Sequence, residues 1–196
     1  MYAKKTLKRI ILFASGSGTN VDNIIKYFKH NPALEIARVF TNNPKAGVIE
    51  RIALTEITTI LFDKAQLTNG ELINQIKFLD PDLIVLAGFL LKIPLDFTQV
   101  FKDKIINIHP SLLPKYGGKG MYGDRVHQLV KEARDQETGI TIHFVNDHYD
   151  QGSIIFQAKV KIGEKDSIDE IANKVHQLEY KFYPEVIQNL LFPYVG

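Results

Sequence analysis

The segment Ile105-Ile106-Asn107-Ile108-His109-Pro110-Ser111-Leu112-Leu113-Pro114 decides how the rest of the chain is interpreted. Its three isoleucines predict a buried parallel strand, and the prolines after it end both helix and strand. Because residues two apart in a strand project to the same side, Asn107 and His109 should emerge together where the strand ends. Open α/β sheets bind ligands at this carboxyl edge, so the segment predicts an α/β fold with a polar site there.

Strand and helix patterns alternate through the residues that precede this segment. We expect strands at residues 9–14, 36–40, 58–61 and 83–87, and helices at 21–28, 47–54, 71–79 and from Pro94 onward. Residues 62–68 are expected to form a loop. Residues 83–87 are apolar throughout, which predicts a strand at the centre of the sheet.

The C-terminal part has a different pattern. The four glycines between Lys115 and Gly123 predict a loop, and we expect Asp124 to cap a helix that runs to about Glu132. Residues 138–145 alternate as a half-buried strand does, and residues 153–161 should return antiparallel to it. Asp166-Ser167 should cap a final helix from Ile168 to about Asn189. With no repeat or linker, we expect a single domain over residues 1–196. It should be a Rossmann-like, mostly parallel twisted sheet with helices on both faces and an antiparallel C-terminal strand pair.

Composition excludes several classes of function. The 196 residues are 45% apolar, enough for one full core, and the formal net charge of +2 does not favour nucleic-acid binding. The chain has no Cys, and its six His residues show no H-E-x-x-H spacing, so we expect no metal. No apolar run is long enough for a signal peptide or a membrane helix. We therefore expect a cytoplasmic protein that is a monomer or a homodimer, without membrane or nucleic-acid partners.

A glycine turn, Ser15-Gly16-Ser17-Gly18-Thr19-Asn20, joins the first strand to the first helix. Its backbone N–H groups and the helix N-terminus could hold a phosphate. It is not the dinucleotide fingerprint, because Val21 stands where the third glycine is needed. A tight turn with Thr19 or Asn20 as the helix cap explains the pattern equally well.

Three histidines elsewhere in the chain, His127, His148 and His176, are interpreted as surface or capping residues.

A resemblance narrows these alternatives. The ordered series formed by residues 107–114, 139–145 and 150–157 resembles the formyltransferase family that uses 10-formyltetrahydrofolate. The glycine turn and residues 86–90 are similar to the branch that acts on phosphoribosylglycinamide (GAR). The similarity extends from Arg9 to about Pro184. A tRNA-modifying relative would be expected to carry an extra C-terminal domain, and a hydrolase of the folate would be expected to carry an N-terminal one.

The resemblance implies transfer of a formyl group from 10-formyltetrahydrofolate to the glycinamide amine of GAR in purine biosynthesis, through a tetrahedral intermediate. Asn107, His109 and Asp150 match the catalytic residues of the family, and the carboxylate is expected to favour the imidazolium form of His109. The residues that match acceptor contacts are Gly18, Thr19, Asn20 and Glu179. The residues expected to bind the folate are Lys64, Leu90, Leu91, Lys92, Ile93, Asn146, Asp147, His148 and Tyr149.

Two other functions stay open at this stage. One is formyl transfer to a different amine, such as a nucleotide-linked amino sugar. The other is a nucleotide-binding module without catalysis, against which the matched Asn, His and Asp argue. The chain also departs from the family between Tyr116 and His127, where it has extra residues that leave substrate contacts of that segment unassigned.

Overall fold

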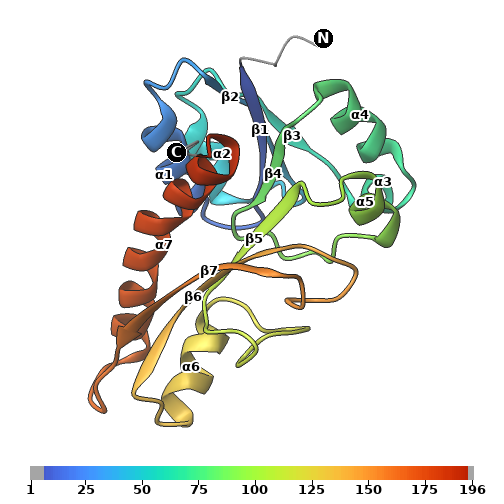
Figure 1. Ribbon diagram of the computed structural model, residues 1–196. Coiled ribbons are helices and arrows are strands. Elements are labelled where there is room, and N and C mark those ends of the chain that lie inside the picture. The colour runs from blue at the N-terminus through green and yellow to red at the C-terminus, as the bar shows by residue number, and fades with distance from the viewer. Residues whose placement is uncertain (1–6, 194–196) are drawn as a thin grey trace.

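The computed structural model describes residues 7–193, which form one seven-stranded sheet flanked by helices (Figure 1). The two ends of the expected domain, 1–6 and 194–196, lie outside the described residues. The strands are β1 (Lys8–Phe13), β2 (Leu34–Thr41), β3 (Thr59–Leu61), β4 (Leu83–Leu86), β5 (Ile105–His109), β6 (Glu137–Phe144) and β7 (Ile154–Lys161). The helices are α1 (Thr19–Phe28), α2 (Gly47–Ile52), α3 (Lys64–Thr68), α4 (Glu71–Leu79), α5 (Leu95–Val100), α6 (Asp124–Glu132) and α7 (Ile168–Leu191).

The strand order in the sheet is β3-β2-β1-β4-β5-β6-β7. The first five strands are parallel, β6 is antiparallel to β5, and β7 is antiparallel to β6. The mostly parallel sheet, the antiparallel C-terminal pair and the central position of β4 are therefore confirmed. The strand order reverses between β1 and β4, and ligands of open α/β sheets bind at such a point.

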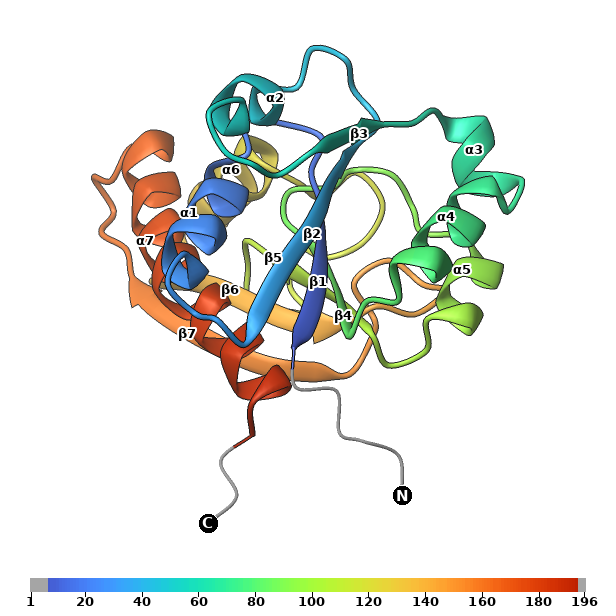
Figure 2. The ribbon, with the colours of Figure 1, turned by 90° about the horizontal axis from the view of Figure 1, so that it is seen from above.

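Alternation along the buried strands produces two cores. Ile10 and Leu12 of β1 enter a core beneath α1 and α7, whereas Ile11 and Phe13 enter a second core beneath α4 and α5. Figure 2 shows α1 and α7 on one side of the sheet and α3, α4 and α5 on the other. On β5 the same alternation sends Ile106 and Ile108 into the first core. The side chain of Asn107 therefore projects from the opposite face of the sheet, away from the first core, and can contribute to a site.

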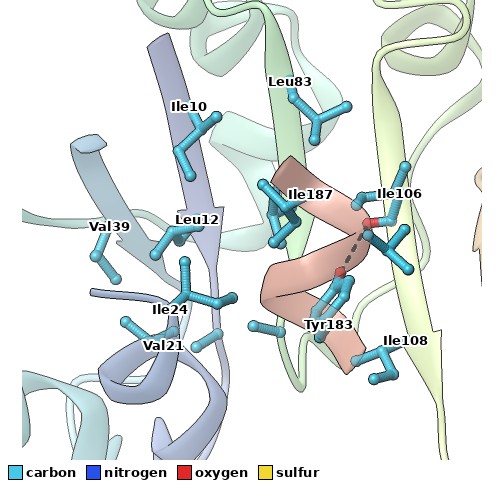
Figure 3. Close-up of a cluster of buried hydrophobic side chains, with 14 of the residues drawn as sticks. Ile10, Leu12, Val21, Ile24, Val39, Leu83, Ile106, Ile108, Tyr183 and Ile187 are labelled. Atoms are coloured by element: carbon cyan, nitrogen blue, oxygen red, sulfur yellow. Dashed lines mark hydrogen bonds between the residues drawn. The ribbon is translucent and has the colours of Figure 1, made fainter. Parts of the chain in front are cut away.

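The first core contains one buried polar group that ties α7 to the sheet. The hydroxyl of Tyr183, a fully buried side chain, donates to the carbonyl of Leu86 at 2.9 Å and lies 3.5 Å from the carbonyl of Ile106 (Figure 3). Burial raises the pKa of Tyr183 well above its ordinary value, so the hydroxyl stays protonated and remains a donor. These contacts connect α7, which carries Glu179, to the last residue of β4 and to the second residue of β5.

Three local predictions were wrong in detail. Residues 62–68 are not all loop, because Asp63 and Gln66 form a capping box that starts α3 at Lys64. Gly18, not Thr19 or Asn20, is the N-cap of α1, with φ of 74°, a conformation that glycine adopts without strain. Gly123 likewise precedes α6, and Asp124 is its first helical residue rather than its cap.

Strand β6 is not half-buried as its alternation suggested. Residues 138–143 are all buried, because α7 packs on one face and the segment after β5 packs on the other. The hydroxyl of Thr141 donates to the carbonyl of Ser111 at 2.7 Å and accepts from the N–H of Leu113 at 3.0 Å. The proline-rich segment is thereby held against the sheet, next to His109.

Gly139→Ala should destabilise the fold by about 2 kcal/mol or more. A Cβ at this position would lie 1.9 Å from the carbonyl oxygen of Ala158 on β7, so the strand pair would have to separate. Urea denaturation followed by circular dichroism measures the effect. Gly16→Ala is the matched control, because its Cβ would meet no heavy atom within 4 Å. Equal midpoints for the two variants would contradict the close packing of β6 on β7.

Within residues 7–193, no helix is both long enough and apolar enough to cross a membrane.

Candidate active site

A cavity of about 560 Å³ opens at the carboxyl ends of β1, β4 and β5. Its walls come from the glycine turn after β1, residues 87–90 after β4, the end of β5, and the glycine-rich loop before α6. Its other lining residues are Tyr149, Asp150, His127 of α6, and His176 and Glu179 of α7. The cavity therefore lies at the reversal of strand order, where the sequence predicted a site.

His109, the last residue of β5, is buried and held on both sides of its ring. Its Nε2 lies 2.8 Å from the carbonyl oxygen of Tyr116, and because a carbonyl only accepts, Nε2 carries a proton. Its Nδ1 lies 3.6 Å from Oδ2 of Asp150. A second proton on the ring would therefore sit on Nδ1, between the imidazole and the carboxylate.

Asp150 favours the imidazolium form of His109, as expected, but burial of the ring, which was not anticipated, has the larger effect on its pKa. Burial lowers the pKa of His109 below its ordinary value, and the neighbouring Asp150 raises it by less. For Asp150 itself, burial acts to raise the pKa, but the rings of His143 and His109 and the N–H of Gly118 outweigh it and lower the pKa. The free protein thus holds a neutral imidazole beside a carboxylate.

Backbone strain places two of these groups. Tyr116 and Asp150 both adopt positive φ, 54° and 55°, a region that non-glycine residues rarely occupy. The strained turn at Tyr116 aims its carbonyl at His109. The turn at Asp150 brings its carboxylate to His109 and to the N–H of Gly118, which donates to Oδ2 at 2.9 Å. The glycine-rich loop is therefore bonded directly to the candidate catalytic carboxylate.

His143 is a site residue that the sequence analysis did not identify. Its Nδ1 donates to the carbonyl of Phe144 at 2.8 Å, which leaves Nε2 as an acceptor for the Asn107 amide at 3.2 Å. Nε2 also lies 3.6 Å from Oδ1 of Asp150. The missing signal was the strand register, in which Asn107 pairs with His143 across β5 and β6. His143 fixes which way the Asn107 amide points.

Replacing this ring should affect chemistry more than binding. In His143→Phe the ring shape stays but the acceptor for Asn107 is lost, so we expect kcat to fall by roughly tenfold with little change in KM. His143→Gln, which retains an acceptor, should recover part of the loss. Steady-state kinetics with melting temperatures as the folding control measures both. An unchanged kcat in His143→Phe would mean that Asn107 is oriented without it.

The glycine turn contributes the predicted acceptor residues to the same cavity. Gly18, Thr19 and Asn20 all line it, and Asn20 Nδ2 donates to Oε2 of Glu179 at 2.9 Å. Burial raises the pKa of Glu179. A Cβ on Gly18 would lie 2.6 Å from Val48, so only glycine fits this turn. The structure thus brings together the four residues predicted to bind the formyl acceptor, which come from the N-terminal end of α1 and from α7.

Of the residues predicted to bind the folate, some line the cavity and others do not. Leu90, which is 45% exposed, and Tyr149 line the cavity, and Lys92 Nζ lies 5.8 Å from the centre of the Tyr149 ring. Ile93 is buried in the second core and Leu91 packs against that core. The residues that do not line the cavity are Lys64, Leu91, Lys92, Ile93, Asn146, Asp147 and His148. Asn146 and Asp147 instead make local contacts with His148 in the turn before Tyr149.

His127 is not the surface residue that was expected. It is 2% exposed, lines the cavity and faces His176, with ring centroids 6.4 Å apart. The signal was the spacing on α6, where His127 shares the inward face with the buried Val126 and Val130. His148 is exposed, as expected.

Among residues 7–193, no group of three or more His, Asp or Glu side chains is arranged to hold a metal ion. The polar side chains that line the cavity include amides, imidazoles and the carboxyl groups of Asp150 and Glu179. Such a set can stabilise an oxyanion and move a proton.

Comparisons with known proteins show which proteins this chain is similar to. Residues 8–187 match the model of the family described as formyl transferase. The chain is 40% identical over 189 residues to phosphoribosylglycinamide formyltransferase of Haemophilus influenzae, covering 93% of this chain and 86% of that protein. A crystal structure of phosphoribosylglycinamide formyltransferase from Bacillus halodurans superposes with a TM-score of 0.85 at 34% identity, covering 95% of this chain and 96% of that one.

The plant relatives are longer than this chain. The chloroplastic phosphoribosylglycinamide formyltransferase of Arabidopsis thaliana is 36% identical over 187 residues, which cover 92% of this chain but 64% of the plant protein. The chain spans 61% of the corresponding protein of Vigna unguiculata, at 35% identity and 93% coverage of this chain.

Proposed function

The chain belongs to the formyl transferase family, and we propose that it transfers the formyl group of 10-formyltetrahydrofolate to the amine of 5'-phosphoribosylglycinamide in purine biosynthesis. One observation carries the proposal. Asn107, His109 and Asp150 meet at the end of β5, in the same cavity as the glycine turn. The similarity to named GAR formyltransferases supports the choice of acceptor.

The proposed reaction requires charge stabilisation and one proton transfer. The glycinamide amine attacks the formyl carbon, the C=O bond opens to an oxyanion, and the C–N bond to the folate then breaks. The Asn107 amide donates to the oxyanion, and so does His109 through Nδ1–H once that nitrogen is protonated. Nδ1 is the nitrogen available for this, because Nε2 is already bonded to Tyr116.

Asp150 and His109 can together carry the proton that the reaction moves from the amine to the folate nitrogen. The amine loses one proton when it attacks, and the folate nitrogen gains one when it leaves, so the pair His109–Asp150 has only to hold that proton between the two events. The 3.6 Å between Nδ1 and Oδ2 allows either a water or a substrate atom to approach both groups. A neutral His109 in the free protein is suited to accept the proton.

Acceptor choice tests the proposal. The phosphate of the acceptor should supply much of its binding through the glycine turn, so the dephosphorylated riboside should have a far lower kcat/KM than GAR. Formyl transfer from 10-formyltetrahydrofolate is measured with GAR, with the riboside and with a nucleotide-linked amino sugar. Preference for the amino sugar, or no transfer to GAR, would overturn the proposed acceptor.

A further inference from the structure

A pair of histidines lies beside the acceptor end of the cavity. His127, on α6, faces His176, on α7, and the His176 ring stacks on Tyr180 with centroids 6.1 Å apart. His176 precedes Glu179 by three residues, so both lie on one face of α7. Because Glu179 bonds to Asn20 in the first turn of α1, the two histidines stand close to the glycine turn.

His127 lacks a partner that its burial calls for. Its Nδ1 is shielded from solvent and has no hydrogen bond, although its ring lines the cavity. A buried polar atom without a partner costs about 1–3 kcal/mol, so such atoms in native structures usually serve a ligand or a function. Oδ1 of Asn20, which lines the same cavity, is likewise buried and has no hydrogen-bond partner. Without a ligand, the end of the cavity formed by α1, α6 and α7 therefore has two buried polar atoms that lack hydrogen-bond partners.

The charges around the cavity indicate what is missing. Of the described residues that line it, Lys119 is the only Lys or Arg, against the carboxyl groups of Asp150 and Glu179. Arg51 donates to the carbonyl of Ser17 but is not part of the lining. A phosphate dianion entering this cavity would meet little permanent positive charge. The histidines are the lining groups that can gain one, and His109 is already occupied by Tyr116 and Asp150.

We propose that His127 and His176 form a proton-accepting pair that supplies positive charge to the acceptor's phosphate, so that binding of the acceptor takes up a proton. The inference rests on the proposed function for the identity of that ligand. It assigns to the pair a role in binding the acceptor rather than in the transfer of the formyl group.

The electrostatic surroundings set the direction of the effect. The pKa of His127 is lowered to about 4, chiefly by burial and also by His176 and His109, while Asp124 acts to raise it. The ring is therefore neutral at pH 7 until an anion arrives, and a dianion in contact raises its pKa. Since each ring of the pair disfavours charge on the other, the pair takes up one proton rather than two.

The consequence is a proton-linked affinity. As pH falls from 8 towards 6, the affinity for a phosphorylated ligand should rise by up to about tenfold per pH unit. Below about pH 6 the phosphate itself begins to gain a proton, and the increase should stop. A ligand without phosphate should show neither effect.

Histidine ring ¹⁵N NMR on the full chain at pH 7 tests the inference directly. On addition of ribose 5-phosphate, one ring of the pair should change from the neutral to the imidazolium pattern, while the exposed His30 should not change. Ribose, which lacks the phosphate, should leave the ¹⁵N pattern of both rings unchanged. The inference fails if neither ring gains a proton at saturation, or if ribose 5-phosphate does not bind at millimolar concentration.

Variants give a second measurement. His127→Gln should raise the KM for GAR by roughly tenfold or more at pH 7, flatten the pH dependence of binding, and change kcat much less. His176→Gln, at a partly exposed position, should do the same and serves if His127→Gln does not fold. His30→Gln is the matched control with unchanged kinetics. If His127→Gln and His176→Gln both kept the wild-type pH dependence of GAR binding, the proposed role of the histidine pair would be wrong.

The two proposals fail separately. Absence of formyl transfer to GAR by the wild-type protein would remove the proposed function, while the NMR result with ribose 5-phosphate would still decide the histidine pair. Transfer to GAR with no protonation of either ring would leave the function intact and remove the pair.

Discussion

His109→Ala and Asn107→Ala should each lower kcat by roughly a hundredfold or more while leaving the dissociation constant for GAR nearly unchanged. Both side chains donate to charge that exists only in the transition state. His109 is buried at the end of β5, and its open Nδ1 faces the cavity beside Asp150. The acceptor's phosphate is expected at the glycine turn, so these substitutions should spare most of its binding.

Single-turnover rates and separate measurements of GAR affinity distinguish the two effects. His30→Ala is the control for loss of a histidine, because His30 is exposed and does not line the cavity. A variant that raised KM severalfold with an unchanged rate would show that the residue binds the ground state. In that case the assignment of Asn107 and His109 as oxyanion donors would be wrong.

Asp150→Asn should lower kcat by roughly a hundredfold and move the pH dependence of His109 to lower pH. Burial already lowers the pKa of His109, and the Asp150 carboxylate opposes that effect because an anion favours the imidazolium. The amide keeps the shape but removes the charge, so the pKa of His109 must fall further. The protonated Nδ1 that stabilises the oxyanion then becomes harder to form.

A pH–rate series from pH 5 to 9 on wild type and Asp150→Asn, under conditions where chemistry limits the rate, measures this shift. Asp150→Glu controls for charge without shape, since it keeps the carboxylate but moves it by one methylene. An unmoved profile with wild-type activity would make Asp150 a turn residue whose positive φ serves only the backbone. The acceptor of the amine's proton would then have to be found elsewhere.

Much of the fold could be predicted because local patterns dominate it. The short apolar run at residues 83–87, next to a turn, predicted a buried strand, which the structure has as β4 (Leu83–Leu86), and helix α4 was predicted with the bounds that the structure gives it. The predictions failed where side-chain bonds or tertiary packing override a local pattern. The capping box at Asp63 starts a helix within an expected loop, and the packing of Thr141 against Ser111 buries the outer face of β6.

The sequence by itself determined the order of the elements except α3, the polar pair Asn107 and His109 at a strand end, and the glycine turn. Only the tertiary structure decided which distant groups meet them. Strand register places His143 against Asn107, the turn at Asp150 brings a carboxylate to His109, and α6 turns His127 towards α7. The physical reason is that a side chain's protonation and orientation depend on burial and on neighbours brought together by folding. The neutral state of His109 is therefore a property of the folded chain, because burial outweighs the carboxylate beside it.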